Sequence, residues 1–268
     1  MLLLNQAQAL YRRVGQHVAQ SKLGRLRDAA APTHEKIGTG YGGWFVPCGL
    51  LGPESLCYGV GAGEDISFEI DLINRYGCEV HSFDPTPRAQ RHVELLRANT
   101  ADRVPTAINN EAGIFYKTDV ACMDRLRFHP LGLWSEDRTM RFYVPENPAH
   151  VSHSIVNLQR TSDYFEASCR TLRTVMQMLG HSELSLLKLD VEGAEYEILA
   201  SILASDIRPS VLCVEFDEGY RPLDDDYLSR IQTMVIRVKA GGYRLTYIDG
   251  WNTTFIHRRA SARNVGNS

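Results

Sequence analysis

The stretch Leu184-Ser-Leu-Leu-Lys-Leu-Asp-Val-Glu-Gly-Ala-Glu195, continued by Tyr-Glu-Ile-Leu-Ala-Ser-Ile-Leu-Ala204, decides the fold. Its first seven residues form a short, nearly continuous apolar run, as a buried strand does. After Gly193, apolar side chains recur with the spacing of one helix face, at Ile198, Leu199, Ile202 and Leu203. The stretch therefore predicts a strand over 184–190 and a helix over 194–204.

Similar units precede and follow this stretch. Apolar runs predict strands over 55–60, 79–84 and 210–216, and helical spacing predicts helices over 66–76, 88–99 and 228–238. Buried strands that alternate with helices favour an α/β protein with a parallel sheet covered on both faces. Two last strands, over 243–248 and 253–257, flank a short turn at Asp249-Gly250, so we expect the sheet to end in an antiparallel hairpin.

We divide the chain into three parts. Residues 1–54 form an N-terminal extension, helical over 1–30 and rich in glycine and aromatic residues over 38–53. Residues 55–258 form the main domain, and residues 259–268 a polar tail. Tyr41, Trp44 and Phe45 of the extension form either a lid over a site or a separate apolar cluster, and the sequence does not choose between these interpretations.

Composition restricts the possible partners and the compartment. In 268 residues, 29 Lys and Arg stand against 32 Asp and Glu, a net charge of −3 that argues against nucleic acid as a partner. No apolar run approaches the roughly 20 residues of a membrane helix, and Leu2-Leu-Leu4 is too short for a signal peptide. The six cysteines include no C-x-x-C pair, which indicates reduced thiols in a cytoplasmic protein without a metal site.

The ends of the first two strands suggest a nucleoside site, because ligands of open α/β sheets bind at the carboxyl ends of the strands. Gly59, Gly61 and Gly63 follow or end the first strand and allow the backbone to turn close to a ligand. Asp84 ends the second strand, 23 residues after Gly61. An acid at this spacing typically binds ribose hydroxyls.

Glu64 and Asp65 stand where a dinucleotide site has its third glycine and its helix start. Two carboxylates there would repel a diphosphate but not a cation. S-adenosylmethionine has an adenosine, a sulfonium and an amino group but no phosphate, so it fits these residues better than a dinucleotide. The other interpretation is that both acids only stabilise the helix start.

Further polar groups follow the later strands. Asp190 and Glu192 leave the strand over 184–190, and Glu215 ends the next one. A carboxylate there could hold the amino group of a ligand or accept a proton from a hydroxyl. Alternatively, these acids cap helices or pair with Lys188. His153, in a polar segment, is a further candidate base, although such a histidine is more often simply solvated.

The string Leu187-Lys-Leu-Asp-Val-Glu-Gly-Ala-Glu195 resembles the motif of FkbM-type methyltransferases, which use S-adenosylmethionine. Three further segments occur in the order that this family has: residues 58–67, Phe83-Asp84-Pro85 and Leu131-Gly132-Leu133. The resemblance covers roughly residues 55–217. It implies a Rossmann-like, seven-stranded methyltransferase sheet and O-methylation.

The resemblance also implies roles for single residues. Gly59, Gly61 and Gly63 would line the cofactor, Asp84 would bind its ribose, and Asp190 and Glu192 would face the methyl-transfer site. The family's first motif usually reads D-x-G-A-N-x-G, whereas this chain has Gly59, Gly63 and Asp65 at the acid, the Asn and the last Gly. We therefore expect Glu64 or Asp65 to take over contacts with the methionine end of the cofactor.

The sequence thus predicts an S-adenosylmethionine-dependent methyltransferase that acts on a hydroxyl group. A small molecule, a glycan, a lipid head group and a protein side chain all remain open as acceptors, and the sequence says nothing of the oligomeric state. Two alternatives remain. One is an NAD(P)-dependent oxidoreductase, which the sheet and Asp84 allow. The other is a non-catalytic nucleoside-binding domain, which the altered glycine motif suggests.

Overall fold

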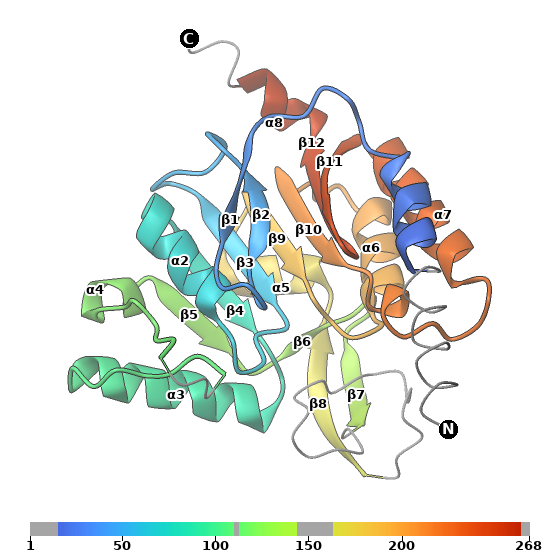
Figure 1. Cartoon of the computed structure of the whole chain (residues 1–268). Helices are drawn as coiled ribbons and strands as arrows, with labels where there is room; N and C mark the ends of the chain where they lie inside the picture. The colour runs from blue at the N-terminus through green and yellow to red at the C-terminus, as the bar shows by residue number, and fades with distance from the viewer. Residues whose placement is uncertain (1–15, 110–112, 144–162, 264–268) are drawn as a thin grey trace, which may run out of the picture.

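The computed structural model describes residues 16–109, 113–143 and 163–263 (Figure 1). Its largest sheet has seven strands in the order β11-β12-β10-β9-β3-β4-β5. Their bounds are β3 Leu56–Val60, β4 Glu79–Phe83, β5 Leu126–His129, β9 Leu186–Leu189, β10 Val211–Glu215, β11 Tyr243–Asp249 and β12 Asn252–His257. Only β12 runs against its neighbours, since its pairings with β10 and β11 are antiparallel and the others are parallel.

This topology confirms the predicted α/β fold, mostly parallel with a C-terminal antiparallel hairpin. Compared with the strand order of a dinucleotide-binding fold, β12 is an additional strand inserted between the fifth and the last parallel strand. The order along the sheet reverses between β3 and β9, which are neighbours although residues 61–185 separate them in the chain. Crevices for ligands form outside the carboxyl ends of strands at such a point.

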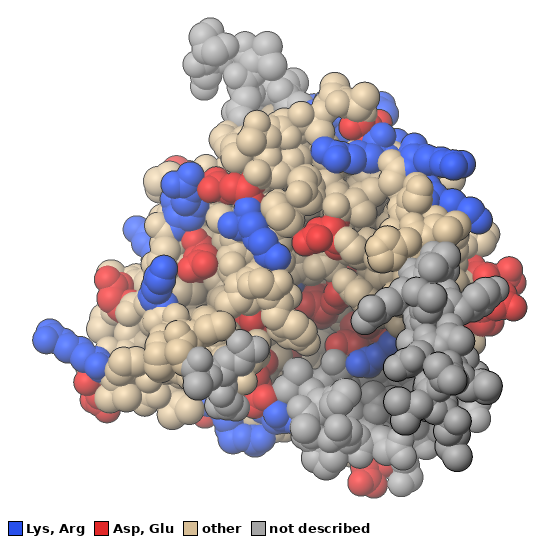
Figure 2. Space-filling view, viewed as in Figure 1, with Lys and Arg blue, Asp and Glu red and all other residues tan. Residues whose placement is uncertain are grey.

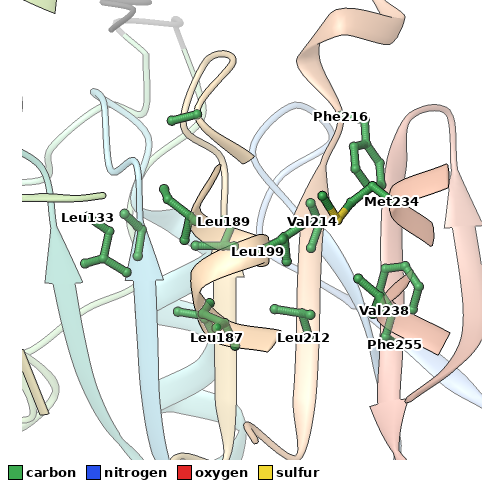
Figure 3. Close-up of a cluster of buried hydrophobic side chains, with 14 of the residues drawn as sticks. Leu133, Leu187, Leu189, Leu199, Leu212, Val214, Phe216, Met234, Val238 and Phe255 are labelled. Carbon is green, nitrogen blue, oxygen red and sulfur yellow. The ribbon is translucent and has the colours of Figure 1, made fainter. Parts of the chain in front are cut away.

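Helices cover both faces of this sheet. One face packs against α5 (Leu172–Leu179), α6 (Glu195–Ala204) and α7 (Tyr227–Ala240), and the other against α2 (Ser67–Tyr76), α3 (Pro87–Ala101) and α4 (Val120–Met123). Figure 3 shows the first core, where Leu187 and Leu189 of β9 lie near Leu199 of α6. Successive strand residues point to opposite faces, so Leu186 belongs to the second core.

The N-terminal extension packs onto the main domain. Residues 16–24 are helical, and Leu23 is fully buried in the core that α7 shares. The strands β1 (His34–Ile37) and β2 (Trp44–Pro47) pair as an antiparallel hairpin, and Trp44 and Val46 are buried in the core beside α2. The described part of the extension thus contributes to both cores, while a domain boundary near residue 55 stays a prediction.

Besides the hairpin of β1 and β2, three features differ from what the sequence pattern predicts. A separate sheet, β6-β8-β7, joins Gly132–Leu133, Tyr164–Arg170 and Arg138–Tyr143, and most of β8 is not buried although its apolar and polar residues alternate from Phe165 on. The tail begins as a helix, α8 (Arg258–Arg263). Aspartates directly before a helix are typical N-caps, but the Asp224-Asp225-Asp226 run precedes α7 without a side-chain cap; instead Asp224 accepts the Asp226 amide and pairs with Arg230.

Two further observations concern the whole molecule. All six cysteines are free thiols. Within the described ranges, no helix combines the length and the apolar character that crossing a bilayer would require. The face seen in Figure 2 mixes acidic and basic side chains, in keeping with the small net charge.

The core that lies between β9, β10 and α6 predicts that two Leu→Ala substitutions differ strongly in their effect on the free energy of unfolding. Leu199 of α6 is fully buried, whereas Leu95 of α3 is 54% exposed. We expect Leu199→Ala to lower the free energy of unfolding by about 2–5 kcal/mol, through lost burial and the cavity left behind. Leu95→Ala should change it by less than about 0.5 kcal/mol. Urea denaturation of both variants measures this, and equal effects would contradict the packing described.

Candidate active site

A cleft of about 570 Å³ opens at the carboxyl ends of the central strands. It lies where the strand order reverses, between the segments that follow β3 and β9. The lining includes apolar groups such as Phe83, Leu133 and Val191, but its charged side chains are mainly acidic. The acids and bases that line it are Glu64, Asp65, Asp84, Lys188, Asp190, Glu192, Glu215, Asp217 and Arg221.

The glycine turn after β3 brings two backbone segments into contact. Gly61 has φ +86°, and a Cβ at this position would lie 1.7 Å from the carbonyl oxygen of Asp190. Only glycine therefore allows the chain after β3 to pass so close to the chain after β9. Gly61 and Gly63 line the cleft, whereas Gly59 does not and lies against the carboxylate of Glu69 instead.

Asp84 sets the shape of this turn from the end of β4. Its Oδ2 accepts a hydrogen bond from the Gly63 amide at 2.9 Å, and its Oδ1 accepts one from the Thr86 amide at 2.7 Å. Each carboxylate oxygen keeps a free lone pair after these bonds. Asp84 lines the cleft and is only 5% exposed, so these two bonds hold its carboxylate in a fixed position there.

Glu64 and Asp65 both line the cleft but already have protein partners. Glu64 pairs with Arg88 of α3 at 2.6 Å. Asp65 accepts hydrogen bonds from the Thr39 hydroxyl at 2.9 Å, the Ser67 amide at 2.9 Å and the Asn109 amide group at 3.1 Å. Asp65 thus fastens the loop between β1 and β2 to the start of α2, which is a positioning role.

Lys188 is the buried cation of the site, with a side chain 3% exposed. The alternation of β9 turns it toward α2 and Trp44, away from Leu187 and Leu189. Its Nζ donates to the Gly61 carbonyl oxygen at 3.0 Å and lies 3.2 Å from Asp190 Oδ2. Burial lowers the pKa of Lys188, but the carboxylates of Asp190 and Glu69 together raise it above its usual value, so the ammonium stays charged.

Asp190, Glu192 and Glu215 all line the cleft. Glu192 has φ +51°, a left-handed conformation that is strained for a residue with a side chain, and it lies 3.8 Å from Arg221. Burial raises the pKa of Glu215, and its hydrogen bond with Asp190 raises it further. The carboxyl groups of Glu215 and Asp190 therefore interact directly within the cleft.

The remaining residues that the sequence analysis singled out differ in where they lie relative to the cleft. His153 lies outside the residues that the structure describes. Tyr41 is 78% exposed at the rim of the cleft, and Trp44 lines the cleft while being almost fully buried. Phe45 does not line it and stacks on Tyr247 at 4.2 Å between ring centroids.

Some lining residues were not predicted by sequence analysis. Tyr220 and Arg221 follow η1 (Asp217–Gly219), and Asn252 begins β12. Because β12 is antiparallel, its first residue lies at the same edge as the last residues of the parallel strands. Examining where the last strand of the predicted hairpin begins would have identified Asn252.

Comparison with known proteins defines the family. A model described as "Methyltransferase FkbM domain" matches residues 59–245, most of the chain. The chain belongs to the FkbM methyltransferase family. The 31-O-demethyl-FK506 methyltransferase FkbM of Streptomyces tacrolimicus is 28% identical over 165 residues, which are 58% of this chain and 62% of that protein. The FkbM resemblance seen in residues 58–67 and 187–195 is confirmed.

Other similarities are more distant. The probable methyltransferase-like protein 24 of Homo sapiens is 24% identical over 152 residues, 56% of this chain and 28% of that protein. The chain thus covers less than two thirds of both curated relatives. A fibrillarin pre-rRNA processing protein of Methanococcus jannaschii shows 12% identity and a TM-score of 0.40, over 77% of this chain and 67% of the fibrillarin chain. Among the described residues of this FkbM-family chain, no group of three or more His, Cys, Asp or Glu could hold a metal ion.

The contact between Gly61 and Asp190 predicts that alanine destabilises the protein more at Gly61 than at Gly63. Gly61→Ala would force a Cβ into the Asp190 carbonyl and should cost at least about 3 kcal/mol of unfolding free energy. Gly63 has φ +54° and no atom within 4 Å of its potential Cβ, so Gly63→Ala should cost only about 1–2 kcal/mol. Thermal or urea denaturation compares the two; a Gly61→Ala protein as stable as Gly63→Ala would contradict the geometry.

The buried carboxylate of Glu195 predicts a pH-dependent stability. Burial raises its pKa from 4.5 to about 8, and its Oε1 accepts the Gly193 amide. The folded protein therefore retains a proton that the unfolded chain has lost, so stability falls as the pH rises from about 4.5 to about 8. Glu195→Gln removes this titration. The unfolding free energy of wild type, measured relative to Glu195→Gln, should fall between pH 5 and pH 8.5, and a constant difference would argue against a raised pKa.

Proposed function

We propose that this FkbM-family protein is an S-adenosylmethionine-dependent methyltransferase that methylates a hydroxyl group. The observation that supports this most directly is the arrangement of Gly61, Gly63 and Asp84. The glycine turn leaves room for a ligand close to the backbone, and Asp84 presents two partly used carboxylate oxygens beside it. Ribose hydroxyls are suitable donors for these oxygens.

The charges at the start of α2 favour this cofactor over a dinucleotide. Glu64 stands at the position of the third glycine of a dinucleotide site, and Asp65 lies next to it in the cleft. A diphosphate placed there would face two carboxylates, of which Glu64 is balanced by Arg88. A sulfonium cation suits the same surroundings, which also include Asp190.

S-adenosylmethionine, when bound, supplies an electrophilic methyl group on its sulfonium. Transfer breaks the sulfur–methyl bond and forms an oxygen–methyl bond at the acceptor hydroxyl, whose proton must leave. In this proposal Asp190 accepts that proton, because it lines the cleft and its Oδ2 lies 3.2 Å from Nζ of Lys188. Trp44 and Leu133 help to exclude water, and the backbone contacts of Gly61 fix the alignment.

Calorimetric titration tests the cofactor assignment. We expect wild-type protein to bind S-adenosylmethionine but not NADH. Asp84→Ala should weaken the affinity about 10- to 100-fold, because hydrogen bonds to a charged group contribute about 1.5–3 kcal/mol. Asp102→Ala changes an exposed aspartate after α3 and serves as the control, with unchanged affinity.

Two outcomes would reject this assignment. Binding of NADH in place of S-adenosylmethionine would favour the oxidoreductase alternative. The non-catalytic alternative would be favoured if S-adenosylmethionine still binds after the loss of Asp190 and Glu192, and if no methyl transfer occurs to any hydroxyl compound tested. A cytoplasmic location and the absence of nucleic acid among the partners remain predictions from composition.

A further inference from the structure

The positive charges of the chain are concentrated in its two terminal segments. Residues 1–27 and 258–268 together contain eight Lys and Arg and no Asp or Glu, whereas the residues between them contain 21 Lys and Arg and 32 Asp and Glu. The net charge of −3 therefore combines two basic segments with a strongly acidic middle part. Such an asymmetry is typical of a protein with an anionic partner.

The fold brings parts of both segments to one place. The chain after the N-terminal helix runs along the edge strand β11, where the Asp28 amide donates to the Leu245 carbonyl oxygen at 2.8 Å. Strand β12, which pairs with β11, leads into α8, and the Arg258 amide donates to the Gly242 carbonyl oxygen at 2.9 Å. We call the resulting surface the basic end and define it by five exposed side chains: Lys22, Arg25, Arg27, Arg258 and Arg259. The side chains at the upper right of Figure 2 are mainly blue, in the region where Figure 1 draws the segment that leads from the N-terminal helix to β1.

Acidic side chains do not neutralise the basic end. Arg27 donates to the carbonyl oxygen of Thr246, a neutral group, and none of the five side chains forms an ion pair with a described residue. Asp28, the acid that follows Arg27 in the sequence, pairs with Lys239 instead at 3.1 Å. The five cations therefore face solvent together, and binding of anions would relieve their mutual repulsion.

The basic end lies at the opposite edge of the sheet from the cleft. Arg258 follows β12, which is antiparallel to β10 and so ends beside the amino ends of the parallel strands. The cleft opens at their carboxyl ends. Strand β11 runs between the two edges in seven residues, roughly 23 Å at about 3.3 Å per residue. A partner bound at the basic end would thus leave the cleft open.

The groups at the basic end suit a membrane surface better than a nucleic acid. Proteins bind single-stranded nucleic acids with exposed aromatic rings as well as cations. The ring of Tyr247, beside Arg27, is instead stacked on Phe45. Val18 lies one helical turn before Lys22, on the same face of the N-terminal helix, and is 50% exposed. An exposed apolar side chain among cations is typical of a helix that lies at lipid head groups.

We propose that the basic end binds the surface of membranes that contain acidic phospholipids, with the cleft facing away from the bilayer. Each exposed Lys or Arg adds to the attraction by the negative potential of such a surface. The inference goes beyond the proposed function and does not depend on the cofactor or the methyl acceptor.

Sedimentation of the full chain with lipid vesicles tests the proposal. We expect binding to vesicles of phosphatidylcholine with about 30% phosphatidylserine, and binding at least about tenfold weaker to vesicles of phosphatidylcholine alone. Because the attraction is electrostatic, raising the NaCl concentration from about 0.1 M to about 0.5 M should release the protein. The triple variant Arg25→Gln/Arg258→Gln/Arg259→Gln should bind the acidic vesicles at least about tenfold more weakly than wild type.

The control is Arg91→Gln/Arg103→Gln/Lys117→Gln, which removes the same charge from exposed residues in and after α3. Helix α3 follows β4, far from β11 in the strand order, so binding to acidic vesicles should stay within about twofold of wild type. Both variants change only exposed side chains, and an unchanged thermal unfolding midpoint checks that they are folded.

Three outcomes would overturn the inference. They are equal binding to the two kinds of vesicle, a basic-end variant that binds like wild type, and tighter binding to duplex RNA than to acidic vesicles at equal phosphate concentration. The last result would assign the basic end to a nucleic acid. All three would leave the proposed function standing, since the titration with S-adenosylmethionine tests that function separately.

Discussion

The ammonium of Lys188 lies inside the protein between the glycine turn after β3 and the carboxylate after β9. It donates to the Gly61 carbonyl and lies 3.2 Å from Asp190, while Glu69 is fully buried nearby and its charge acts on the ammonium. A buried charge is costly unless it is paired, and removing one partner of such a pair typically costs about 3–5 kcal/mol. One side chain therefore fixes the two segments between which the cleft opens, and the positions of Gly61 and Asp190 depend on it.

Most of the large sheet followed from the sequence because its strands are buried on both faces. Leu186, Leu187 and Leu189 belong to an apolar run of the kind that is typical of a strand buried on both faces. The short turn at Asp249-Gly250 requires the last strand to be antiparallel to the one before it. Strand β8 was missed although Phe165, Ala167 and Cys169 alternate with polar residues, because this largely unburied strand contains no apolar run. The hairpin of β1 and β2 was also missed, since glycines between short strands are equally typical of a loop.

The candidate site was predictable where side chains follow parallel strands. Asp84, Asp190 and Glu215 line one cleft because the carboxyl ends of those strands meet at one edge. What a carboxylate binds depends on neighbours distant in sequence. Asp65 contacts Thr39 and Asn109, and Glu64 pairs with Arg88, so neither is as available to a ligand as residue type alone suggested. Asn252 was missed because it begins a strand instead of ending one.

The affinity of Lys188→Met for S-adenosylmethionine tests the central role of this ammonium most directly. Burial raises the pKa of Glu69, which can take up a proton when the cation is lost, so the substitution can leave a folded protein whose glycine turn is no longer fixed. Calorimetry should show affinity at least tenfold below wild type, while Lys36→Met, at a partly exposed lysine of β1, leaves affinity unchanged. A folded Lys188→Met protein that binds S-adenosylmethionine as tightly as wild type would contradict this account.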